Sequence, residues 1–388
     1  MKRIGILVER QRAYGRSICL GISRFAQGHD DWSMRMLEWS DADNPRRLRE
    51  YDGFIVRVLN ARIARVFQST GKPVVDVFHE CDWPGFSFVD QHARIVGQMA
   101  ARHFIEHKFA HFAFCGFNGR RYSDKRRDAF ARCLALNRFA CSVYDTPAAE
   151  ISNFDRTVIR EEQLALSKDN RRLKKWICDL PKPVAVFCAH DLRAYQLIET
   201  CRHCGIRIPE DVAILGVDND ELVCNFVTPT LSSIDLNGEK VGETAAALLS
   251  QMMADRNLPP QFVPIKPAGL VERKSTQVYP IDPPWLSDAL VFIRSNVARR
   301  LTAADVHAHV GRSHTLVSDA FRQALGLTVQ QEIQRTRLAE AHRLVTTTGL
   351  PLSAVAAQSG FASVQYFCTS FTKAFGKPPS DLRQVQGP

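Results

Sequence analysis

The sequence predicts a two-lobed α/β domain of parallel sheets, followed by an all-α domain with two helix-turn-helix units. Two observations carry this prediction. From the first residues to about residue 270, short apolar runs alternate with amphipathic stretches, a pattern typical of α/β domains. Further on, a short helix, a glycine and a second helix occur twice at almost the same spacing. The 388 residues suffice for two or three domains with sizeable cores.

The first domain is organised by its apolar runs. The expected strands are Ile4–Val8, Phe54–Val58, Val74–Phe78, Phe86–Val89, Phe112–Cys115, Cys141–Tyr144, Val184–Cys188, Val212–Val217 and Ser232–Asp235. The expected helices are Arg16–Gln27, Ile63–Gln68, Gln91–His107, Lys125–Asn137, Arg171–Asp179, Asp191–His203 and Glu239–Met253. Because the strands are almost continuously apolar, both faces of the sheets must be covered, as in parallel sheets. About eleven such units are too many for one sheet, so we expect two lobes with a ligand site at the carboxyl ends of the strands.

The segment Pro351–Arg383 predicts one helix-turn-helix unit. A helix over Leu352–Gln358 leads into a turn at Gly360, and a second helix is expected from Ser363 to Phe375. The expected buried face of that second helix is Phe367, Ser370, Phe371 and Ala374. Its opposite face is small or hydrogen-bonding, with Gln365, Cys368, Thr369 and Thr372. Such a helix can lie in a DNA major groove, although an ordinary helical hairpin is the alternative for this unit alone.

A second copy of the pattern favours DNA binding. In Leu301–Leu325 a short helix meets Gly311, and a second helix begins at Ser313, a suitable N-cap. The expected buried face is Val317, Ala320, Phe321 and Ala324, and the outer face is Thr315, Ser318, Asp319 and Arg322. Gly311 precedes Gly360 by 49 residues. A helical run over Val329–Thr346 joins the units, so their recognition helices would face successive major grooves.

This region resembles the DNA-binding domain of the AraC family of transcription regulators. The resemblance extends over about Leu286–Arg383 and rests on Gly311-x-Ser313, Phe321, Gly326, Arg337-Leu338-x-x-Ala341, Gly360-Phe361, Tyr366-Phe367, Phe371-x-Lys373, Gly376-x-Pro378-Pro379 and Arg383. It implies contacts with double-stranded DNA from Arg312, His314, Thr315, Ser318, Asp319 and Arg322 in the first unit, and from Ser363, Val364, Gln365, Cys368, Thr369 and Lys373 in the second. The first unit departs from the pattern. His307 stands where the second unit has Ala356, and Asp319 takes a position where the family often has a basic residue, so whether this unit reads bases stays open.

The distribution of charge agrees with a DNA-contacting domain. The whole sequence has a formal net charge of +10. The part from Leu286 to Pro388 contains nine Arg and two Lys against four Asp and two Glu, which is a net charge of +5. Half of the net charge therefore lies in about a quarter of the chain, as contact with phosphates requires.

The segment Ala185–Asp235 resembles the effector-binding domain of the LacI family, which shares the fold of periplasmic sugar-binding proteins. The matching pieces are Ala189-His190-Asp191, Gly205-Ile-Arg-Ile-Pro209-Glu-Asp211, Gly216-Val-Asp218-Asn219 and Pro229-Thr-Leu231-Ser-Ser-Ile, with weaker matches at Phe88-Val-Asp90 and Arg126-x-x-Ala129-Phe130. The resemblance implies a sugar effector. His190 stands where the family often has an amide side chain.

Polar side chains at strand ends form the candidate sugar site. Asp191 and Asp218 each follow an apolar strand, and carboxylates and arginine forks give sugar hydroxyls paired hydrogen bonds. The candidate ligand-binding residues are Asp90, Arg126, His190, Asp191 and Asp218, and a resemblance to regulators of the xylose-operon type adds Tyr14 and Arg16 from the loop after the first expected strand. For Asp191 and Asp218 the alternative is that each caps the helix that follows. For Tyr14 and Arg16 the alternative is a role in dimerisation.

The two resemblances together are similar to regulators of the xylose-operon type. The likeness extends to Ala13-Tyr14-Gly15-Arg16, after the first strand, and to Val271-Glu-Arg273-Lys-Ser275-Thr276, at the end of the effector domain. A LacI-type regulator carries its DNA-binding helices before the effector domain, whereas this sequence begins with the expected first strand, so DNA reading is expected at the C-terminal end. The likeness implies a homodimer that acts through RNA polymerase, with a pentose such as D-xylose as effector.

Other features set limits. The first ten residues lack an apolar core long enough for a signal peptide, and no run approaches a membrane span, so we expect a cytoplasmic protein that binds no membrane. The eleven cysteines are expected to be reduced and mostly buried thiols. Cys201 and Cys204 have metal-like spacing, but a second pair is missing, and a helix end before Gly205 is the preferred interpretation. No metal or cofactor is expected.

The sequence therefore predicts a sugar-binding domain over 1–276, a linker over 277–284 and a DNA-binding domain over 285–388. The predicted function is a sugar-responsive, sequence-specific regulator that activates sugar-utilisation genes. A repressor, or a regulator that responds to another small molecule, is the alternative. A carbohydrate carrier would leave the C-terminal domain without a role. An enzyme is not expected, because no nucleophile elbow, phosphate loop or pair of metal ligands is found.

Overall fold

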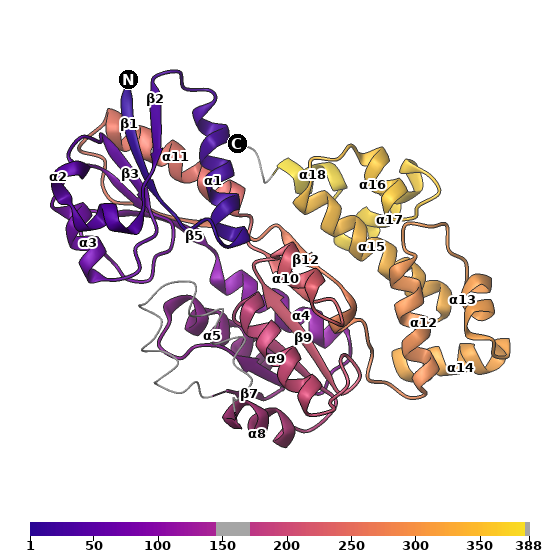
Figure 1. The fold of residues 1–388 in the computed structure, drawn as a ribbon. Helices are drawn as coiled ribbons and strands as arrows, with labels where there is room; N and C mark the ends of the chain where they lie inside the picture. The colour runs from indigo at the N-terminus through magenta and orange to yellow at the C-terminus, as the bar shows by residue number, and fades with distance from the viewer. Residues whose placement is uncertain (145–170, 385–388) are drawn as a thin grey trace. The chain divides into compact units, whose positions relative to one another are not determined.

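The computed structural model describes residues 1–144 and 171–384, and Figure 1 shows their fold. These residues form two compact units. The first consists of Met1–Glu106 and Ala110–Thr276, and the second of His107–Phe109 and Gln277–Pro388. The chain thus passes from the α/β unit into the helical unit after Thr276.

The α/β unit contains two six-stranded sheets, which confirms the prediction of two lobes. The first sheet has the order β11-β5-β4-β3-β1-β2 and consists of β1 (Lys2–Leu7), β2 (Trp32–Met36), β3 (Gly53–Val56), β4 (Val74–Asp76), β5 (Ser87–Gln91) and β11 (Phe262–Ile265). Among the described residues, all of its strand pairings are parallel. The second has the order β12-β10-β9-β8-β6-β7 and consists of β6 (His111–Cys115), β7 (Cys141–Val143), β8 (Val184–Cys188), β9 (Val212–Val217), β10 (Ser232–Asp235) and β12 (Gly269–Val271). Only β12 runs antiparallel among its described pairings.

Helices pack on both lobes. The first lobe has α1 (Ala13–Ala26), η1 (Trp39–Asp43), α2 (Pro45–Leu48), α3 (Ala61–Gln68) and α11 (Gly238–Ala254). The second has α4 (Ala93–Glu106), α5 (Arg121–Leu136), α8 (Arg171–Asp179), α9 (Asp191–His203), α10 (Glu221–Phe226) and η3 (Lys274–Thr276). On one face of the second sheet, Phe104 and Phe130 of α4 and α5 pack with Phe187 of β8. Apolar burial on both faces explains why its central strands are continuously apolar.

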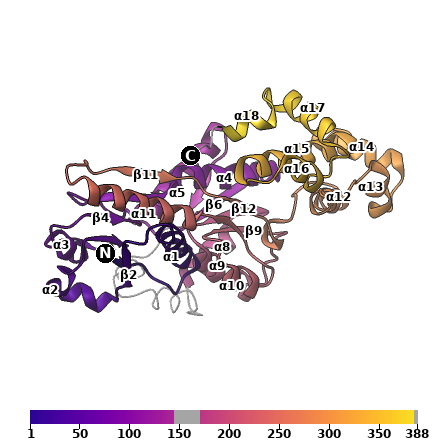
Figure 2. The same ribbon diagram turned by 90° about the horizontal axis from the view of Figure 1, so that it is seen from above.

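Helices α1 and α11 cross in close backbone contact, and Figure 2 shows them side by side. A Cβ at Gly242 would lie 1.9 Å from the carbonyl oxygen of Ile18, and a Cβ at Gly21 would lie 1.9 Å from that of Glu239. The two glycines are therefore what lets the helices approach. This crossing brings the chain's first helix against one that follows β10.

The helical unit consists of α12 (Pro284–Ser295), α13 (Ala303–Val310), α14 (His314–Leu325), α15 (Val329–Thr347), α16 (Leu352–Gln358), α17 (Val364–Phe375) and α18 (Pro379–Gln384). One apolar core joins α12, α13, α14 and the start of α15, and another joins the rest of α15 to α16, α17 and α18. Two helix-turn-helix units on one long helix are thus present. Among the described residues, no helix is long and apolar enough to cross a membrane.

Two details of the helical unit differ from the prediction. Ala324 and Ala374 were expected on buried faces, but both are exposed, whereas Phe321 and Phe371 are fully buried. Each alanine lies in the last turn before a glycine C-cap, where the helix has run past the core. The expected linker also packs more tightly than foreseen, because Tyr279 is buried in the helical core.

Candidate functional site

Polar side chains from both lobes meet at the carboxyl ends of the parallel strands. On the first sheet they are Glu9 after β1, Arg57 after β3, Asp76 at the end of β4 and Asp90 in β5; on the second they are His190 and Asp191 after β8 and Asp218 after β9. The charges of Arg126, Arg12 and Arg57 lower the pKa of Asp218, although burial raises it more strongly. Because Arg57 belongs to one lobe and Arg126 to the other, the two strand edges share one site.

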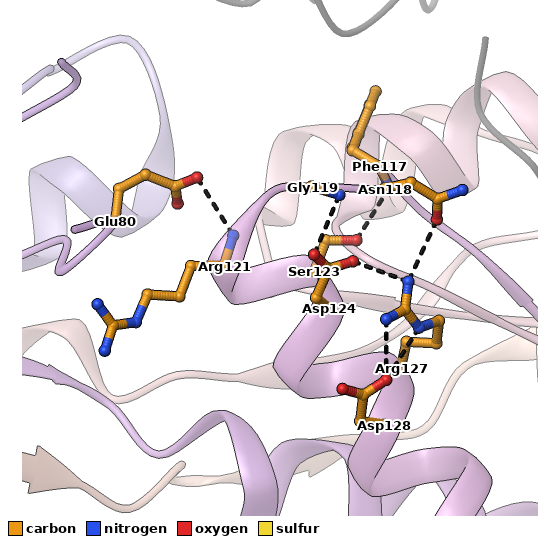
Figure 3. Close-up of polar contacts among 9 residues, drawn as sticks. All are labelled: Glu80, Phe117, Asn118, Gly119, Arg121, Ser123, Asp124, Arg127 and Asp128. Atoms are coloured by element: carbon orange, nitrogen blue, oxygen red, sulfur yellow. Dashed lines mark hydrogen bonds and ion pairs between the residues drawn. The ribbon is translucent and has the colours of Figure 1, made fainter. Parts of the chain in front are cut away.

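The start of α5 is fixed by a hydrogen-bond network that Figure 3 shows. The hydroxyl of Ser123 accepts from the backbone N–H of Phe117 at 2.9 Å, and Asp124 accepts from that of Gly119 at 3.0 Å. Arg127 bridges Asp124 and Asp128. The helix that carries Arg126 is therefore held rigidly at its first turn.

Glu80 extends this network to the other lobe. It follows β4, and its carboxylate accepts a hydrogen bond from the backbone N–H of Arg121 at 3.2 Å, as Figure 3 shows. On the opposite side, Asp220 caps α10 through Leu222 and accepts from the N–H of Ala13, at the start of α1, at 3.1 Å. Hydrogen bonds thus link the lobes at two places.

Arg126 is only 3% exposed and lies at the centre of the group. One of its Nη atoms donates to the backbone carbonyl of Ala189, and its guanidinium lies 5.3 Å from the ring centre of Tyr122. Behind it, a Cβ at Gly97 of α4 would lie 2.5 Å from the Arg126 carbonyl oxygen, so only glycine lets α4 and α5 pack at this point. Its Nε is buried without a hydrogen-bond partner among the described residues and can donate to a ligand.

His190 is the N-cap of α9. The alternative prediction for Asp191 gave that role to Asp191 instead. Its Nδ1 accepts from the backbone N–H of Arg193 at 3.0 Å, so Nε2 carries the proton. Burial, and then the charges of Arg12, Arg193 and Arg126, hold the pKa of His190 well below its usual value, so the ring is neutral. Nε2 is buried and free to donate to a ligand.

Asp191 acts mainly within the protein. Its two carboxylate oxygens accept from the hydroxyl of Ser233 at 2.6 Å and from the backbone N–H of Asp220 at 2.8 Å, and the Cys224 thiol lies at 3.5 Å. It therefore ties the start of α9 to the loop after β9 and to strand β10. Burial and the neighbouring carboxyl of Asp218 raise its pKa.

Asp218 is not a helix cap, since Asp220 has that role. Its φ of 110° is unusual for a residue other than glycine, and backbone strain of this kind is found at ligand sites. Its carboxylate has no hydrogen bond or ion pair with the described part of the chain. It is the acceptor of the second lobe that is most available to a ligand.

Two carboxyls of the first lobe are buried and have raised pKa values. Burial raises the pKa of Asp76 to about 8, against the hydrogen bonds that its Oδ1 accepts from the N–H groups of Val58 and Phe78. Burial raises the pKa of Asp90 to about 7, against a hydrogen bond from Gln91. Near neutral pH these carboxyls can therefore be donors as well as acceptors.

Hydrogen-bonding capacity is concentrated in this group. Within residues 1–144 and 171–384, buried atoms without a partner include the hydroxyls of Tyr14 and Tyr122, Nε of Arg57 and Arg126, Oδ2 of Asp76 and Nε2 of His190. Such atoms are rare in folded proteins unless water or a ligand binds them. Donors and acceptors interleaved in this way match a small molecule with several hydroxyl groups.

The structure brings together most of the residues that the sequence singled out. Tyr14 joins the group, and burial and then the Asp90 charge raise its pKa well above the usual value. Arg16 lies on the outside, where it donates to the backbone carbonyls of Arg10 and Gln11 at 3.1 and 2.8 Å. Five further members were not anticipated: Glu9, Arg12, Arg57, Asp76 and Tyr122. The strand-end argument applied to Asp191 and Asp218 would also have found Glu9, Arg57 and Asp76.

The candidate DNA interface consists of α14 and α17 with the residues before them. Their N-caps are Ser313 and Ser363, whose hydroxyls accept from Leu316 at 3.4 Å and Tyr366 at 3.2 Å. The predicted contact residues that are exposed are Arg312, His314, Thr315, Asp319, Arg322, Ser363, Val364, Gln365, Thr369 and Lys373. Ser318 and Cys368 are half-buried at the same position of their helices. Leu316 and Tyr366, also equivalent, are about half exposed at 49% and 52% and were not anticipated.

The two departures in the first unit have structural consequences. The ring of His307 stacks on that of His314 at 4.1 Å, so the larger side chain leans across the turn instead of filling the place of Ala356. Asp319 lies 4.0 Å from Arg322 on the exposed face, which offsets part of its negative charge. The outer face of α14 is therefore more polar than that of α17.

Several residues that carry the AraC resemblance hold the helical unit together. A Cβ at Gly360 would lie 2.1 Å from the carbonyl oxygen of Val297, and its φ of 74° also favours glycine. Arg337 of α15 donates to the carbonyl of Leu301 at 2.8 Å, and Arg383 of α18 donates to that of Leu350. These contacts fasten the turn of the second unit and the last helix.

Comparison with known proteins agrees with this arrangement. Residues 101–276 match the periplasmic binding protein-like domain family, and residues 307–384 match a helix-turn-helix domain family. The xylose operon regulatory protein of Escherichia coli (strain K12) is 24% identical over 393 residues, which cover 99% of this chain and 97% of that protein. The chain is similar to the xylose operon regulatory proteins over almost its whole length. The predicted resemblance is thereby confirmed.

Solved structures share the fold. The structure of the xylose-binding transcription activator XylR has a TM-score of 0.60 and 24% sequence identity, and the match covers 100% of this chain and 98% of that one. A LacI family transcriptional regulator from Enterococcus faecium, with bound ribose, has a TM-score of 0.56 and 19% identity over 72% of this chain and 100% of that one. The chain thus combines a periplasmic binding protein-like domain with a C-terminal helix-turn-helix domain.

Proposed function

We propose that this chain is a sugar-responsive transcription regulator whose effector is a pentose such as D-xylose. The observation that carries the proposal is the group of buried, partly unpaired donors and acceptors at the strand ends of both lobes, in a fold shared with sugar-binding regulators. A sugar that bridges Asp90 and Arg126 with Asp218 favours closure of the lobes. The protein acts in the cytoplasm as a homodimer without catalytic activity and activates transcription through RNA polymerase.

The effector is tested by thermal shift of the full chain with pentoses and hexoses. A true effector raises the melting temperature by several degrees at about 100 times its Kd. Asp218→Ala abolishes this shift, whereas Asp31→Ala, which removes an exposed carboxylate just before the edge strand β2, leaves it unchanged. If no sugar raises the melting temperature of the unmodified chain, the effector is a different molecule. If the shift survives Asp218→Ala, the site is misplaced.

DNA reading is tested by selecting binding sequences from a random duplex library. Gln365→Ala or Thr369→Ala relaxes base preference at one or two positions, because both side chains are exposed on α17. Arg312→Ala weakens binding to all sequences alike, because a cation before α14 contacts phosphate. An unchanged selected sequence for both α17 variants argues against α17 as the reader.

A further inference from the structure

The segment Arg273–Thr276, here called the exit segment, is where the chain leaves the α/β unit. It follows β12, the edge strand beside β10 (Figure 1), and Thr276 is the last residue of that unit. Ser275 and Thr276 are fully buried. The hydroxyl of Ser275 accepts from the backbone N–H of Ser232 at 2.8 Å and donates to the carbonyl of Ile214 at 2.6 Å. The hydroxyls of Thr276 and Ser232 lie 2.7 Å apart, so the exit segment is fastened to β9 and β10.

The connection from the exit segment to the helical unit is short. Tyr279 is buried in the helical core, and its backbone N–H donates to the hydroxyl of Ser287 at 2.8 Å. Only Gln277 and Val278 lie between Thr276 and this second anchor. Since each residue spans at most about 3.6 Å, so short a connection has little slack to absorb a displacement of Thr276. A movement of the exit segment is thus passed on through the chain itself.

Arg273 joins the exit segment to the loop after β9, which carries Asp218. One Nη atom of Arg273 donates to Oδ1 of Asn219 at 2.9 Å, and the other donates to the carbonyl of Leu231 at 2.9 Å. Its backbone N–H donates to the hydroxyl of Ser232 at 2.7 Å. The planar guanidinium fixes the directions of both side-chain hydrogen bonds at once, which a lysine cannot do. One residue therefore contacts both the loop beside the effector site and the strand that holds the exit segment.

The loop after β9 has an uncommon backbone conformation. Asp218 and Asn219 have φ of 110° and 48°, two consecutive positive values at residues other than glycine. Such conformations persist only where surrounding contacts determine them, and they cluster at ligand sites and switches. The contacts here include the hydroxyl of Ser233, which accepts from the Asn219 N–H at 3.0 Å, and the guanidinium of Arg273, which holds the Asn219 amide. A ligand that binds the Asp218 carboxylate therefore acts on the loop that Arg273 contacts.

We propose that Arg273 is a positioning residue that couples the effector site to the exit segment, and so to the helical unit. This rests on the proposed function, since it requires an effector that binds Asp218. Coupling arises when the loop and the exit segment share two arrangements and the effector binds one of them more tightly. Arg273 makes the two change together, because its hydrogen bonds to Asn219 and Leu231 cannot both be kept if only one partner moves.

Hydrogen exchange of the full chain without effector tests the link itself. Asn219→Gly removes the amide that Arg273 contacts, and glycine suits the φ of 48°. The Ser275 amide, which donates to the carbonyl of Thr230 at 2.9 Å, should then exchange faster by about tenfold or more. In an Arg273→Met background the same change should have no further effect, because the contact is already lost. Unchanged exchange at Ser275 in Asn219→Gly overturns the proposal, whatever the effector is.

A second measurement tests the coupling. The full chain is titrated with D-xylose and with the DNA duplex selected from the random library, each alone and each in the presence of the other. In the unmodified chain the two ligands should change each other's affinity by the same factor, about 5 to 150. Arg273→Met should bring this factor towards 1, while the affinity for each ligand alone stays within about threefold. A merely structural role would instead weaken both ligands and leave the factor unchanged.

Arg207→Met is the matched control. It removes an ion pair of 2.7 Å with Asp211 in the same lobe, and it should retain the full coupling factor. Coupling that survives Arg273→Met, or that Arg207→Met reduces equally, overturns the proposal. The proposed function fails separately, when no sugar raises the melting temperature of the unmodified chain. The exchange rate of Ser275 then still decides whether the link exists.

Discussion

Asp76 is the clearest example of a side chain whose chemistry is set by its surroundings. It ends β4, accepts two backbone hydrogen bonds at Oδ1 and is fully buried, so its pKa is raised to about 8. A carboxyl whose pKa is higher in the folded than in the unfolded state favours folding below its ordinary pKa. That contribution is lost as the pH rises to the folded value. The contribution of Asp76 to the stability of the α/β unit should therefore fall as the pH rises from its ordinary pKa of about 4 to its folded pKa of about 8.

We expect Asp76→Asn to remove part of this decline. Asparagine keeps the oxygen that accepts from Val58 and Phe78 but cannot ionise. Relative to the unmodified chain, the variant gains free energy of unfolding between pH 6 and pH 8, with a slope of at most about 1.4 kcal/mol per pH unit. Urea unfolding at several pH values measures the difference. Parallel pH curves for the two proteins would show that Asp76 is ionised in the folded state.

For single residues, the sequence predicted which side chains lie near the site better than it predicted what each of them contacts. It placed Asp191 and Asp218 at strand ends, but only the structure shows that Ser233 and Asp220 occupy both oxygens of Asp191. Those partners lie 42 and 29 residues away in the chain, so no local pattern indicates them. The position of Arg16 outside the site could not be predicted for a similar reason, because its hydrogen bonds to Arg10 and Gln11 depend on how the preceding loop folds back.

At the scale of elements, the crossing of α1 and α11 depends on glycine. We expect Gly242→Ala to destabilise the α/β unit by about 2 to 4 kcal/mol, because the new methyl group would overlap the backbone of Ile18 and the helices must move apart. Gly28→Ala is the matched control. The nearest atom to its Cβ, the Phe25 carbonyl oxygen, would lie 3.7 Å away, so the change stays within about 0.5 kcal/mol. Equal stability of both variants, measured by urea unfolding, would contradict this account.

The turn of the second helix-turn-helix unit depends on glycine for two reasons. Gly360 has positive φ and touches the backbone of Val297. We expect Gly360→Ala to destabilise the helical unit by about 2 to 4 kcal/mol and to weaken DNA binding in proportion to the unfolded fraction. Gly349→Ala has open space around the new methyl group and no unusual backbone angle, so it serves as the control. Circular dichroism during urea unfolding measures both.

The elements themselves were predicted well where the apolar pattern along the chain is regular. The predicted bounds of α8, α9, β8, β9 and β10 agree with those observed. The strands that were missed lie at sheet edges, where the apolar pattern fails: β2 exposes four of its five residues, and β11 contains Pro264 and is largely open to solvent. Edge strands are recognised by their pairing partner, which the sequence does not show.

At the scale of the whole molecule, the helical unit should bind DNA by itself. Residues 277–388 contain nine Arg and two Lys against five Asp and two Glu, and this net charge of +4 predicts binding that weakens steeply with salt, with log K falling by about 0.9 per log unit of salt for each phosphate contact. The affinity of the fragment 277–388 for DNA should fall in this way in titrations from about 50 to about 200 mM salt. Salt-independent binding would contradict a phosphate-contacting interface.

A shorter fragment tests the boundary. The sequence suggested a start near Trp285, but Tyr279 is buried in the helical core, and its N–H donates to Ser287 at 2.8 Å. A fragment from Trp285 should therefore melt at a lower temperature than the fragment 277–388. Equal melting temperatures would mean that residues 277–284 act only as a linker.

The order of the two recognition helices gives any bound DNA site a direction. One long helix, α15, joins them, and their exposed faces differ, with Thr315, Asp319 and Arg322 in one and Gln365, Thr369 and Lys373 in the other. If both helices contact bases, two unlike helices in a fixed order distinguish a sequence from its reverse complement. A DNA site in the reverse orientation would place the bases preferred by α14 against α17, and those preferred by α17 against α14. A single chain would then bind its DNA site in one preferred orientation, so an operator for this chain would have a direction.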